Sequence, residues 1–271
     1  MYGGLMVRVL LDPTEGEPFE IERTDGRSPV ILVCEHASRT IPRTLSDLGA
    51  KPETLTSHAA WDIGALAVAR KLSELLDAPL IHQRFSRLVY DCNRPPDAQD
   101  AIPERSEIHA IPGNRNLSDE ARRQRVTEIY EPFRQALAEL IAARTAPSRQ
   151  PVIVTIHSFT RVYFGIARHR AIGLLHDRDL RLADAMLQLA EEQGISNAMR
   201  NYPYGPEDGV THTLRLHAVQ NGLLNVMIEY CSDLIDTEQG QDEWAKRTAK
   251  LLETALERFH IDIHAAGPQQ A

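Results

Sequence analysis

Residues 151–158 read PVIVTIHS, an apolar run that begins after a proline and ends at a histidine. The run is too short for a buried helix and is rich in valine and isoleucine, so it predicts a buried strand over residues 152–156. Two further runs of the same kind, at residues 30–34 and 223–228, predict two more buried strands. Strands of this kind are typical of a sheet covered by helices.

Stretches with helical periodicity alternate with the apolar runs. This alternation predicts a single α/β domain spanning residues 1–271, with a mostly parallel sheet and helices on both faces. Short strands are also expected over 79–82, 88–91 and 172–175. Helices are expected over 63–76, 118–144 with a break at Pro132, 179–193, 211–220 and 241–259.

Two connections refine this architecture. Only residues 83–87 separate the strands expected over 79–82 and 88–91, which is too few for a crossover helix. We therefore expect these two strands to pair antiparallel and to make the sheet mixed. Residues 93–116 are rich in proline, aspartate and asparagine, and predict a long ordered loop with a functional role.

Composition excludes several classes of protein. The chain of 271 residues has a net charge of −8 and no long block of lysine and arginine, which argues against binding nucleic acid and favours a small-molecule partner. Residues 1–11 do not resemble a signal peptide, and no apolar run is long enough to span a membrane. The three cysteines, Cys34, Cys92 and Cys231, lie far apart in the chain and are expected to be buried. Unpaired cysteines suit a reducing compartment, so we expect a cytoplasmic protein.

Three of the expected strands lead directly into a functional side chain. The segments ILVCEH, VIVTIHS and NVMIEY end at or near His36, His157 and Glu229. In open α/β sheets, ligands bind beyond the carboxyl ends of the strands, so these groups are expected to meet in one crevice. Two imidazoles and a carboxylate suit a Zn²⁺ site that activates water. Each residue alone has an ordinary explanation as a hydrogen-bonded strand end, but their joint occurrence favours a metal site.

A third metal ligand is less obvious. The segment HAAWD places His58 and Asp62 four residues apart at the start of a predicted helix. Asp62 is the preferred third ligand, although a carboxylate at a helix start also has a purely structural explanation. His58 is an alternative contact that orients a ligand.

A dense polar patch follows at residues 84–94. Arginine presents a rigid fork to carboxylates, so Arg87, Asn93 and Arg94 are candidates for holding a substrate carboxylate beside the metal. The alternative is a surface salt-bridge cluster with Asp91 and Asp97. Residues 211–218 contain two further candidates, His212 and His217. They either line the pocket or form a polar helix face.

Several ordered motifs resemble the N-formylglutamate amidohydrolase family over about residues 30–230: CEHAS, HAAWDIGA, SRLVYDCNRPPDAQDAIPE, IPGN, TIHSFT, THTLRLHA and IEY. The resemblance implies a fold similar to zinc carboxypeptidases. It implies His36 and His157 as metal ligands, the Asn93–Arg94 pair as the grip on a substrate carboxylate, and Glu229 as general base. Arg87 would assist in polarising the carbonyl.

Two departures from related motifs matter. Carboxypeptidases take two ligands from an HxxE motif, but the position three after His36 is Arg39. The third ligand is therefore open between Asp62 and, as a weaker candidate, Glu35. The segment at residues 35–37 also differs from the Pro-His-Ser type motif of well-characterised formylglutamate hydrolases, which suggests a broader branch of substrates.

These observations predict an enzyme that hydrolyses the amide of an N-formyl amino acid, in first place N-formyl-L-glutamate to formate and L-glutamate. Its cofactor is expected to be Zn²⁺ or another divalent transition metal. The alternatives are a related zinc amidohydrolase or carboxypeptidase with another N-acyl or peptide substrate, a non-catalytic carboxylate-binding protein, and a serine hydrolase using Ser38 or Ser158. No GxSxG motif supports the last. The sequence leaves the oligomeric state open.

Overall fold

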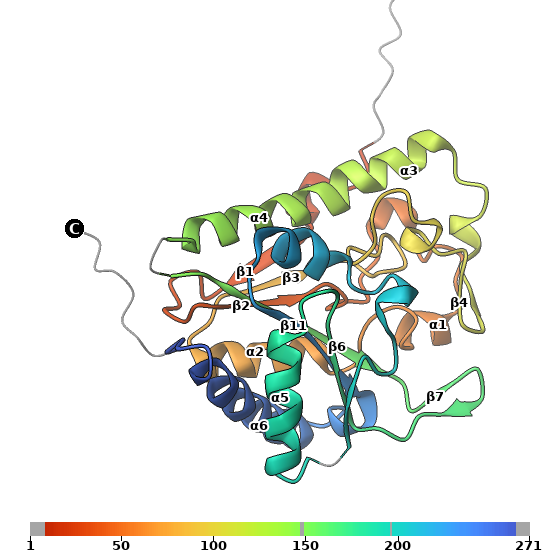
Figure 1. Cartoon of the computed structure of the whole chain (residues 1–271). Helices are drawn as coiled ribbons and strands as arrows, with labels where there is room; N and C mark the ends of the chain where they lie inside the picture. Colours follow the sequence, from red (N-terminus) through yellow and green to blue (C-terminus); the bar gives the residue numbers. More distant parts are fainter. Residues whose placement is uncertain (1–8, 147–148, 196, 264–271) are drawn as a thin grey trace, which may run out of the picture.

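Seven strands form the central sheet of the computed structural model, which describes residues 9–146, 149–195 and 197–263 (Figure 1). Most of the N-terminal segment considered above, residues 1–8, lies outside these ranges. The strand order is β1-β3-β2-β6-β11-β9-β10. The strands are β1 Phe19–Glu22, β2 Val30–Cys34, β3 Leu80–Gln83, β6 Val152–Phe159, β9 Ile172–Leu175, β10 Ala198–Arg200 and β11 Asn225–Cys231.

The sheet is mixed and mostly parallel, as predicted. Strands β3, β2, β6 and β11 run parallel to one another, whereas β1 pairs antiparallel with β3 and β9 pairs antiparallel with β11. The antiparallel pair expected between residues 79–82 and 88–91 is wrong. Residues 88–90 are buried, but residues 87–89 form a turn, in which the amide of Val89 donates to the carbonyl of Ser86. Their apolar character reflects burial rather than strand pairing.

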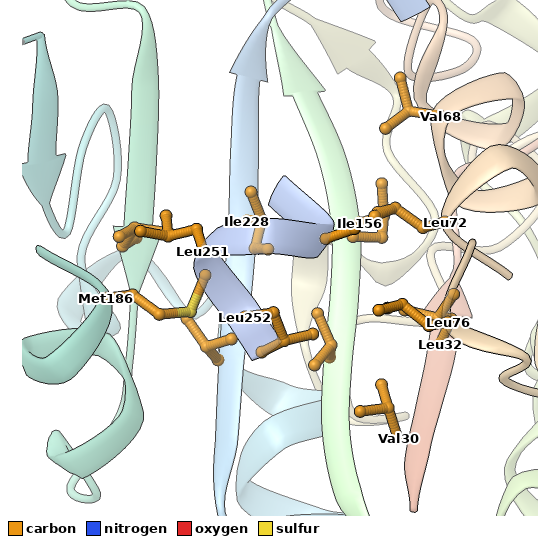
Figure 2. Packing of buried hydrophobic residues seen from close by; sticks show 14 of the residues in the cluster. Val30, Leu32, Val68, Leu72, Leu76, Ile156, Met186, Ile228, Leu251 and Leu252 are labelled. Atoms are coloured by element: carbon orange, nitrogen blue, oxygen red, sulfur yellow. The ribbon is translucent and has the colours of Figure 1, made fainter. Parts of the chain in front are cut away.

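One face of the sheet packs against helices α2 Ala65–Leu76, α5 Arg181–Glu192 and α6 Glu238–Glu257 (Figure 1). Because side chains alternate along a strand, only every second residue of each strand points to this face. Figure 2 shows Leu32, Ile156 and Ile228 from three neighbouring strands packing in one core with side chains of these helices. The sheet is therefore covered here by a continuous apolar layer.

The opposite face packs against a π-helical turn at Val126–Tyr130 and α4 Glu131–Arg144, which continue from α3 Asp119–Arg125. The break expected at Pro132 takes the form of this π-helical turn, which directly precedes α4. Proline lacks an amide hydrogen, and its ring clashes with the carbonyl four residues earlier, so the preceding turn cannot keep regular α-helical bonds. Residues 214–218, within the helix expected over 211–220, also form a π-helical turn.

The loop expected over residues 93–116 contains a small hairpin of β4 Arg105–Ser106 and β5 His109–Ala110. A second hairpin, β7 Val162–Tyr163 with β8 Ile166–Ala167, follows β6, and α1 Pro52–Thr56 precedes α2. No helix within the described ranges is both long and apolar enough to cross a membrane. All three cysteines are buried free thiols, which confirms the expectation that they are core residues.

Candidate active site

The face of the sheet opposite α2 carries a row of polar residues near the carboxyl ends of its central strands. His157 of β6 and Glu229 of β11 are directly paired in the register of the two parallel strands. Both strands continue two residues further than these side chains, so only His36 lies beyond the end of its strand. Their position inside regular strands gives His157 and Glu229 a fixed direction, because strand alternation turns both toward the same face.

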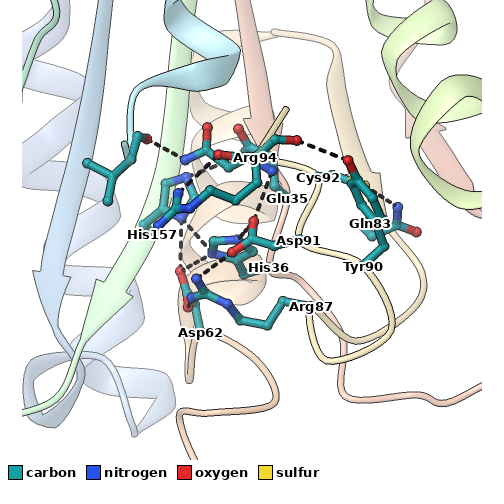
Figure 3. Close-up of polar contacts among 12 residues, drawn as sticks. Glu35, His36, Asp62, Gln83, Arg87, Tyr90, Asp91, Cys92, Arg94 and His157 are labelled. Carbon is teal, nitrogen blue, oxygen red and sulfur yellow. Dashed lines mark hydrogen bonds and ion pairs between the residues drawn. The ribbon is translucent and has the colours of Figure 1, made fainter. Parts of the chain in front are cut away.

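Three potential ligand atoms meet in this row. The Nδ1 atoms of His36 and His157 are 3.1 Å apart, and Oδ2 of Asp62 lies 3.2 Å from the first and 2.9 Å from the second (Figure 3). All three residues are buried. Two ligands of a tetrahedral zinc ion lie about 3.4 Å apart, given metal–ligand distances near 2.1 Å. The donor set and its spacing therefore fit a zinc ion.

The backbone places Asp62 at this point. Its amide donates to the carbonyl of His36 at 2.9 Å, and its Oδ2 also accepts from the amide of Ser158 at 3.2 Å. Gly64 follows with a φ of 80°, and a Cβ there would lie 2.1 Å from the carbonyl oxygen of Ile235. Only glycine fits this approach, so it allows the chain to turn sharply from Asp62 into α2.

Each histidine of the group also contacts a second buried carboxylate through its other ring nitrogen. Nε2 of His36 is 2.7 Å from Oδ1 of Asp91, and Nε2 of His157 is 3.1 Å from Oε2 of Glu35 (Figure 3). Carboxylates in this position orient metal-bound imidazoles and raise their basicity. Glu35, the weaker candidate for third ligand, thus lies on the far side of the His157 ring, whereas Asp62 lies between the two Nδ1 atoms.

The charges of the group are unbalanced without a cation. Burial disfavours the ionised form of Asp62, but the charges of His36 and His157 and their hydrogen bonds outweigh this effect. They hold the pKa of Asp62 well below its ordinary value. Burial likewise lowers the pKa of His157, but the Glu35 charge and bonds to Asp62 and Glu35 raise it well above its ordinary value. The cluster therefore demands positive charge, which protons supply in the absence of a metal and a divalent cation would supply in their place.

Asp91 was overlooked as a site residue in the sequence, where it was considered only as a surface salt-bridge partner. The structure buries it, and it also accepts from the amide of Asn93 at 2.9 Å. Nothing in the spacing of the patch indicates that Asp91 points toward His36, 55 residues earlier, so only the folded chain reveals the contact.

We expect Asp91→Asn to weaken metal binding about 10- to 100-fold, because an amide does not support the His36 ring as a carboxylate does. Equilibrium dialysis against buffered Zn²⁺, followed by elemental analysis, measures the change. Asp97→Asn, at an exposed position of the same loop, is the matched control and should bind metal as the wild type does. Equal affinity in both variants would contradict the role of Asp91.

Arg87 joins the same network instead of standing free. Its Nη2 is 2.7 Å from Oδ2 of Asp91, and its Nη1 is 3.3 Å from Oδ1 of Asp62 (Figure 3). Both terminal nitrogens therefore already contact carboxylates of the protein, so the role of its fork in gripping a substrate carboxylate stays a prediction. The side chain keeps 27% exposure and lines the cavity described next.

A cavity of about 290 Å³ opens directly onto the ligand group. Glu229 lines it, and its Oε2 is buried with no hydrogen-bond partner among the described residues. Burial raises the pKa of Glu229 to about 7. A carboxylate with a free buried oxygen and a pKa near neutrality, facing a metal-type cluster, is suited to exchange protons with a bound molecule.

One wall of the cavity is aromatic. Tyr163 and Tyr204 line it, and the guanidinium carbon of Arg168 lies 4.5 Å from the ring centre of the first and 4.9 Å from that of the second. Arg168 also donates to the Tyr204 hydroxyl at 3.1 Å. The stacked cation holds both rings in place across from the metal-type cluster. No motif of the sequence indicated this wall.

The Asn93–Arg94 pair lines the cavity, but its two side chains differ. The Asn93 amide donates to the carbonyl of Val210 and accepts from the amide of Thr213, so it anchors residues 210–213. Arg94 donates from Nε to Asp100 at 2.6 Å and from Nη1 to two backbone carbonyls. Within the described ranges no residue accepts from its Nη2. The structure therefore leaves Arg94, rather than Asn93, able to donate to a ligand.

Neither His212 nor His217 lines the cavity. Nε2 of His212 is 2.8 Å from the hydroxyl of Tyr130, and burial lowers the pKa of His217 to about 4. Of the two alternatives for His212, lining the pocket is therefore wrong. The anchored segment at 210–213 is close to the site, but this ring is turned toward Tyr130 of the helical layer.

The two serines considered as nucleophiles are not activated by a base. The Ser158 hydroxyl donates to the carbonyl of Ile63 at 2.9 Å, and the Ser38 hydroxyl donates to the hydroxyl of Thr40 at 3.1 Å. A serine nucleophile requires an adjacent general base. The geometry therefore does not favour serine chemistry.

Comparisons with known proteins agree with this picture. The sequence profile of the family described as N-formylglutamate amidohydrolase matches residues 28–236. The crystal structure of a gene product from Agrobacterium tumefaciens is 53% identical, with a TM-score of 0.90 over 93% of this chain and 99% of that chain. N-formylglutamate amidohydrolase from Ralstonia eutropha is 19% identical, with a TM-score of 0.65 over 90% and 98%, which shows a shared fold. The comparison with curated proteins found no match.

Proposed function

This chain belongs to the N-formylglutamate amidohydrolase family, and from that premise we propose that it hydrolyses N-formyl-L-glutamate to formate and L-glutamate in a metal-dependent reaction. Membership confirms the family that the motifs indicate. The observation that supports the reaction is the meeting of three ligand-type atoms and the free carboxylate oxygen of Glu229 in one cavity. The following steps derive what each residue contributes.

His36, Asp62 and His157 would hold the metal, and Asp91 and Glu35 would orient the two imidazoles. A divalent ion bound there would act as a Lewis acid and would lower the pKa of a water molecule toward neutrality. The ligand atoms lie 2.9–3.2 Å apart before any ion is added, so little rearrangement is required for binding. Zn²⁺ is the proposed ion because two imidazoles and one carboxylate are a common catalytic zinc set.

Glu229 is the proposed general base. Its carboxylate accepts a proton from water, and the water oxygen forms a bond to the formyl carbon. The bond between that carbon and nitrogen then breaks, and Glu229 returns the proton to the departing nitrogen. Formate and the free amine leave, and the carboxylate is restored.

Arg94 is the proposed anchor for a carboxylate of the substrate. Arg94 lines the cavity, its Nη2 has no acceptor among the described residues, and its other contacts hold the guanidinium in place. A preformed charge-assisted bond of this kind positions the scissile amide at little entropic cost. Arg87, whose charge lies beside Asp62, would stabilise negative charge that develops on the carbonyl oxygen.

The size of the cavity suits such a substrate. N-formylglutamate has about 12 non-hydrogen atoms, which a space of about 290 Å³ accommodates but a folded peptide does not enter. The cavity therefore favours a single amino-acid derivative over a long peptide.

A substrate panel on metal-stripped and metal-loaded protein tests the proposal. We expect formate release from N-formyl-L-glutamate only after Zn²⁺ is restored, and slower turnover of N-acetylglutamate and peptides. At least one of the two mono-amides of N-formylglutamate should show a kcat/KM lower by a factor of about 10 or more, because it loses the charge-assisted bond to Arg94. Turnover that survives removal of metal would overturn the mechanism. Faster turnover of a substrate with another acyl group would show that N-formyl-L-glutamate is not the preferred substrate. Ligand-induced stabilisation without turnover would indicate a binding protein.

A further inference from the structure

A second group of potential metal ligands lies at the same cavity. His58, which follows α1, faces Glu107 and His109 of the β4–β5 hairpin. One ligand atom from each residue lies within 4.8 Å of the others. None of these residues is a contact of the His36 cluster described above, and only His58 lines the cavity. Two imidazoles and a carboxylate from separate elements are thus assembled at one point.

The contact between His58 and Glu107 is unusual for a hydrogen bond. Nε2 of His58 lies 3.0 Å from Oε2 of Glu107, yet this buried nitrogen has no aligned hydrogen-bond partner in the part of the chain that the structure describes. A buried ring nitrogen without a partner requires an explanation, such as a bound water or ion. The 3.0 Å between these two ligand-type atoms, with His109 as a third group beside them, is a spacing that neighbours in a coordination sphere adopt.

The other polar side-chain atoms of the two hairpin residues, Glu107 and His109, are hydrogen-bonded within the protein. Oε1 of Glu107 accepts from the amide of Phe164 at 2.5 Å, and Nδ1 of His109 is 3.1 Å from the hydroxyl of Thr54. These bonds leave Oε2 of Glu107 and Nε2 of His109 as the atoms available to a ligand. Metal-binding side chains are oriented in the same manner by contacts outside the coordination sphere.

We propose that His58, Glu107 and His109 form a second binding site for a divalent transition metal, with Zn²⁺ as the best match, at the mouth of the cavity. Imidazole nitrogens select zinc and similar ions over magnesium and calcium, which prefer oxygen ligands. The three residues are partly exposed, so water completes the coordination. The ion enters from solvent without passing the His36 cluster.

Occupation of this site has a mechanical consequence. The ion ties the segment after α1 to the β4–β5 hairpin, and Glu107 already ties that hairpin to the β7–β8 hairpin through Phe164. Tyr163, next to Phe164, lies with its ring centre 6.2 Å from that of His58 and lines the cavity. The second ion therefore connects the segments around the cavity mouth.

Metal stoichiometry on the full-length protein tests the site. Protein stripped by a chelator is dialysed against buffered Zn²⁺ and its zinc is counted by elemental analysis. We expect two ions per chain in the wild type and one in His109→Asn, whose amide keeps a group near Nδ1 for Thr54 but removes Nε2. Zinc affinity at this site should fall about 10-fold or more. His260→Asn, an exposed position with φ of 58° that asparagine tolerates, is the matched control and should retain two ions.

Glu107→Gln provides an independent variant if His109→Asn does not fold. Glutamine keeps a carbonyl oxygen for Phe164 and removes the charge, so it too should bind one ion. One ion in the wild type, unchanged in both variants, would overturn the second site while leaving the His36 cluster intact. An ion lost from His36→Ala but kept in His109→Asn identifies the first cluster, and the reverse pattern identifies the second, so failure of either assignment is distinguishable.

Discussion

Glu229→Gln is expected to lower kcat by about 100- to 10,000-fold while metal content stays that of the wild type. Glutamine keeps the shape of the side chain but cannot accept a proton from water. Because Glu229 does not belong to the group of ligand atoms, its loss should separate chemistry from metal binding. Formate release under saturating N-formylglutamate, together with elemental analysis of the same sample, measures both quantities.

The matched control for this variant is Glu207→Gln, an exposed glutamate on the loop beside the cavity. It should turn over substrate at the wild-type rate. If Glu229→Gln also kept normal turnover with metal bound, Glu229 would not be the base. Loss of metal along with activity would instead place Glu229 in the coordination sphere, contrary to the assignment made here.

His36→Ala is expected to remove the metal of the first cluster and to reduce kcat/KM at least about 1,000-fold. Lewis-acid activation contributes several kcal/mol to such reactions, and about 1.4 kcal/mol corresponds to a factor of ten in rate. The substitution also leaves Asp91 and Asp62 without their shared imidazole. Elemental analysis of purified protein measures the metal, and far-ultraviolet circular dichroism checks that the chain is folded.

Two companion variants complete this test. Asp62→Asn keeps the size of the side chain, so it reports on coordination even if His36→Ala unfolds, and it should also lose metal. His169→Ala, at an exposed position, should retain both metal and activity. Stoichiometric metal bound at the first cluster of a folded His36→Ala protein would refute the ligand assignment.

The buried strands of this fold were predictable because each is apolar on both faces. Residues 30–34 and 152–156 are covered by helices on either side, and such coverage leaves an unmistakable pattern in the chain. The edge strands β1 and β10 were missed, since they are short and partly exposed. Residues 88–91 were wrongly expected to form a strand because burial of a turn produces the same apolar run.

The candidate metal ligands were also predictable only in part from the sequence. His36, Asp62 and His157 were each named from the sequence, and the fold brings their ligand atoms together. The sequence left Glu35 and Asp62 as alternatives for the third position. Strand geometry and the backbone bond from Asp62 to His36 place one carboxylate between the Nδ1 atoms and the other behind the His157 ring.

Partners of the long polar side chains could not be read from the chain. Arg87 was expected at the substrate site, and it lines the cavity, but its ion pairs with Asp62 and Asp91 were not predicted. His212 was expected to line the pocket, but it faces Tyr130, 82 residues earlier. A flexible side chain finds its partner only after distant segments have been brought together, and local spacing does not encode that choice.

The sequence by itself therefore determined the α/β architecture, the family and most residues of the metal-type cluster, because periodicity and ordered motifs are local properties of the chain. The tertiary structure alone decided which carboxylate meets the two imidazoles, which arginine keeps a free donor, and that His58 meets the hairpin at residues 105–110. These outcomes depend on distances between segments far apart in the chain, and such distances are set by packing rather than by spacing along the sequence.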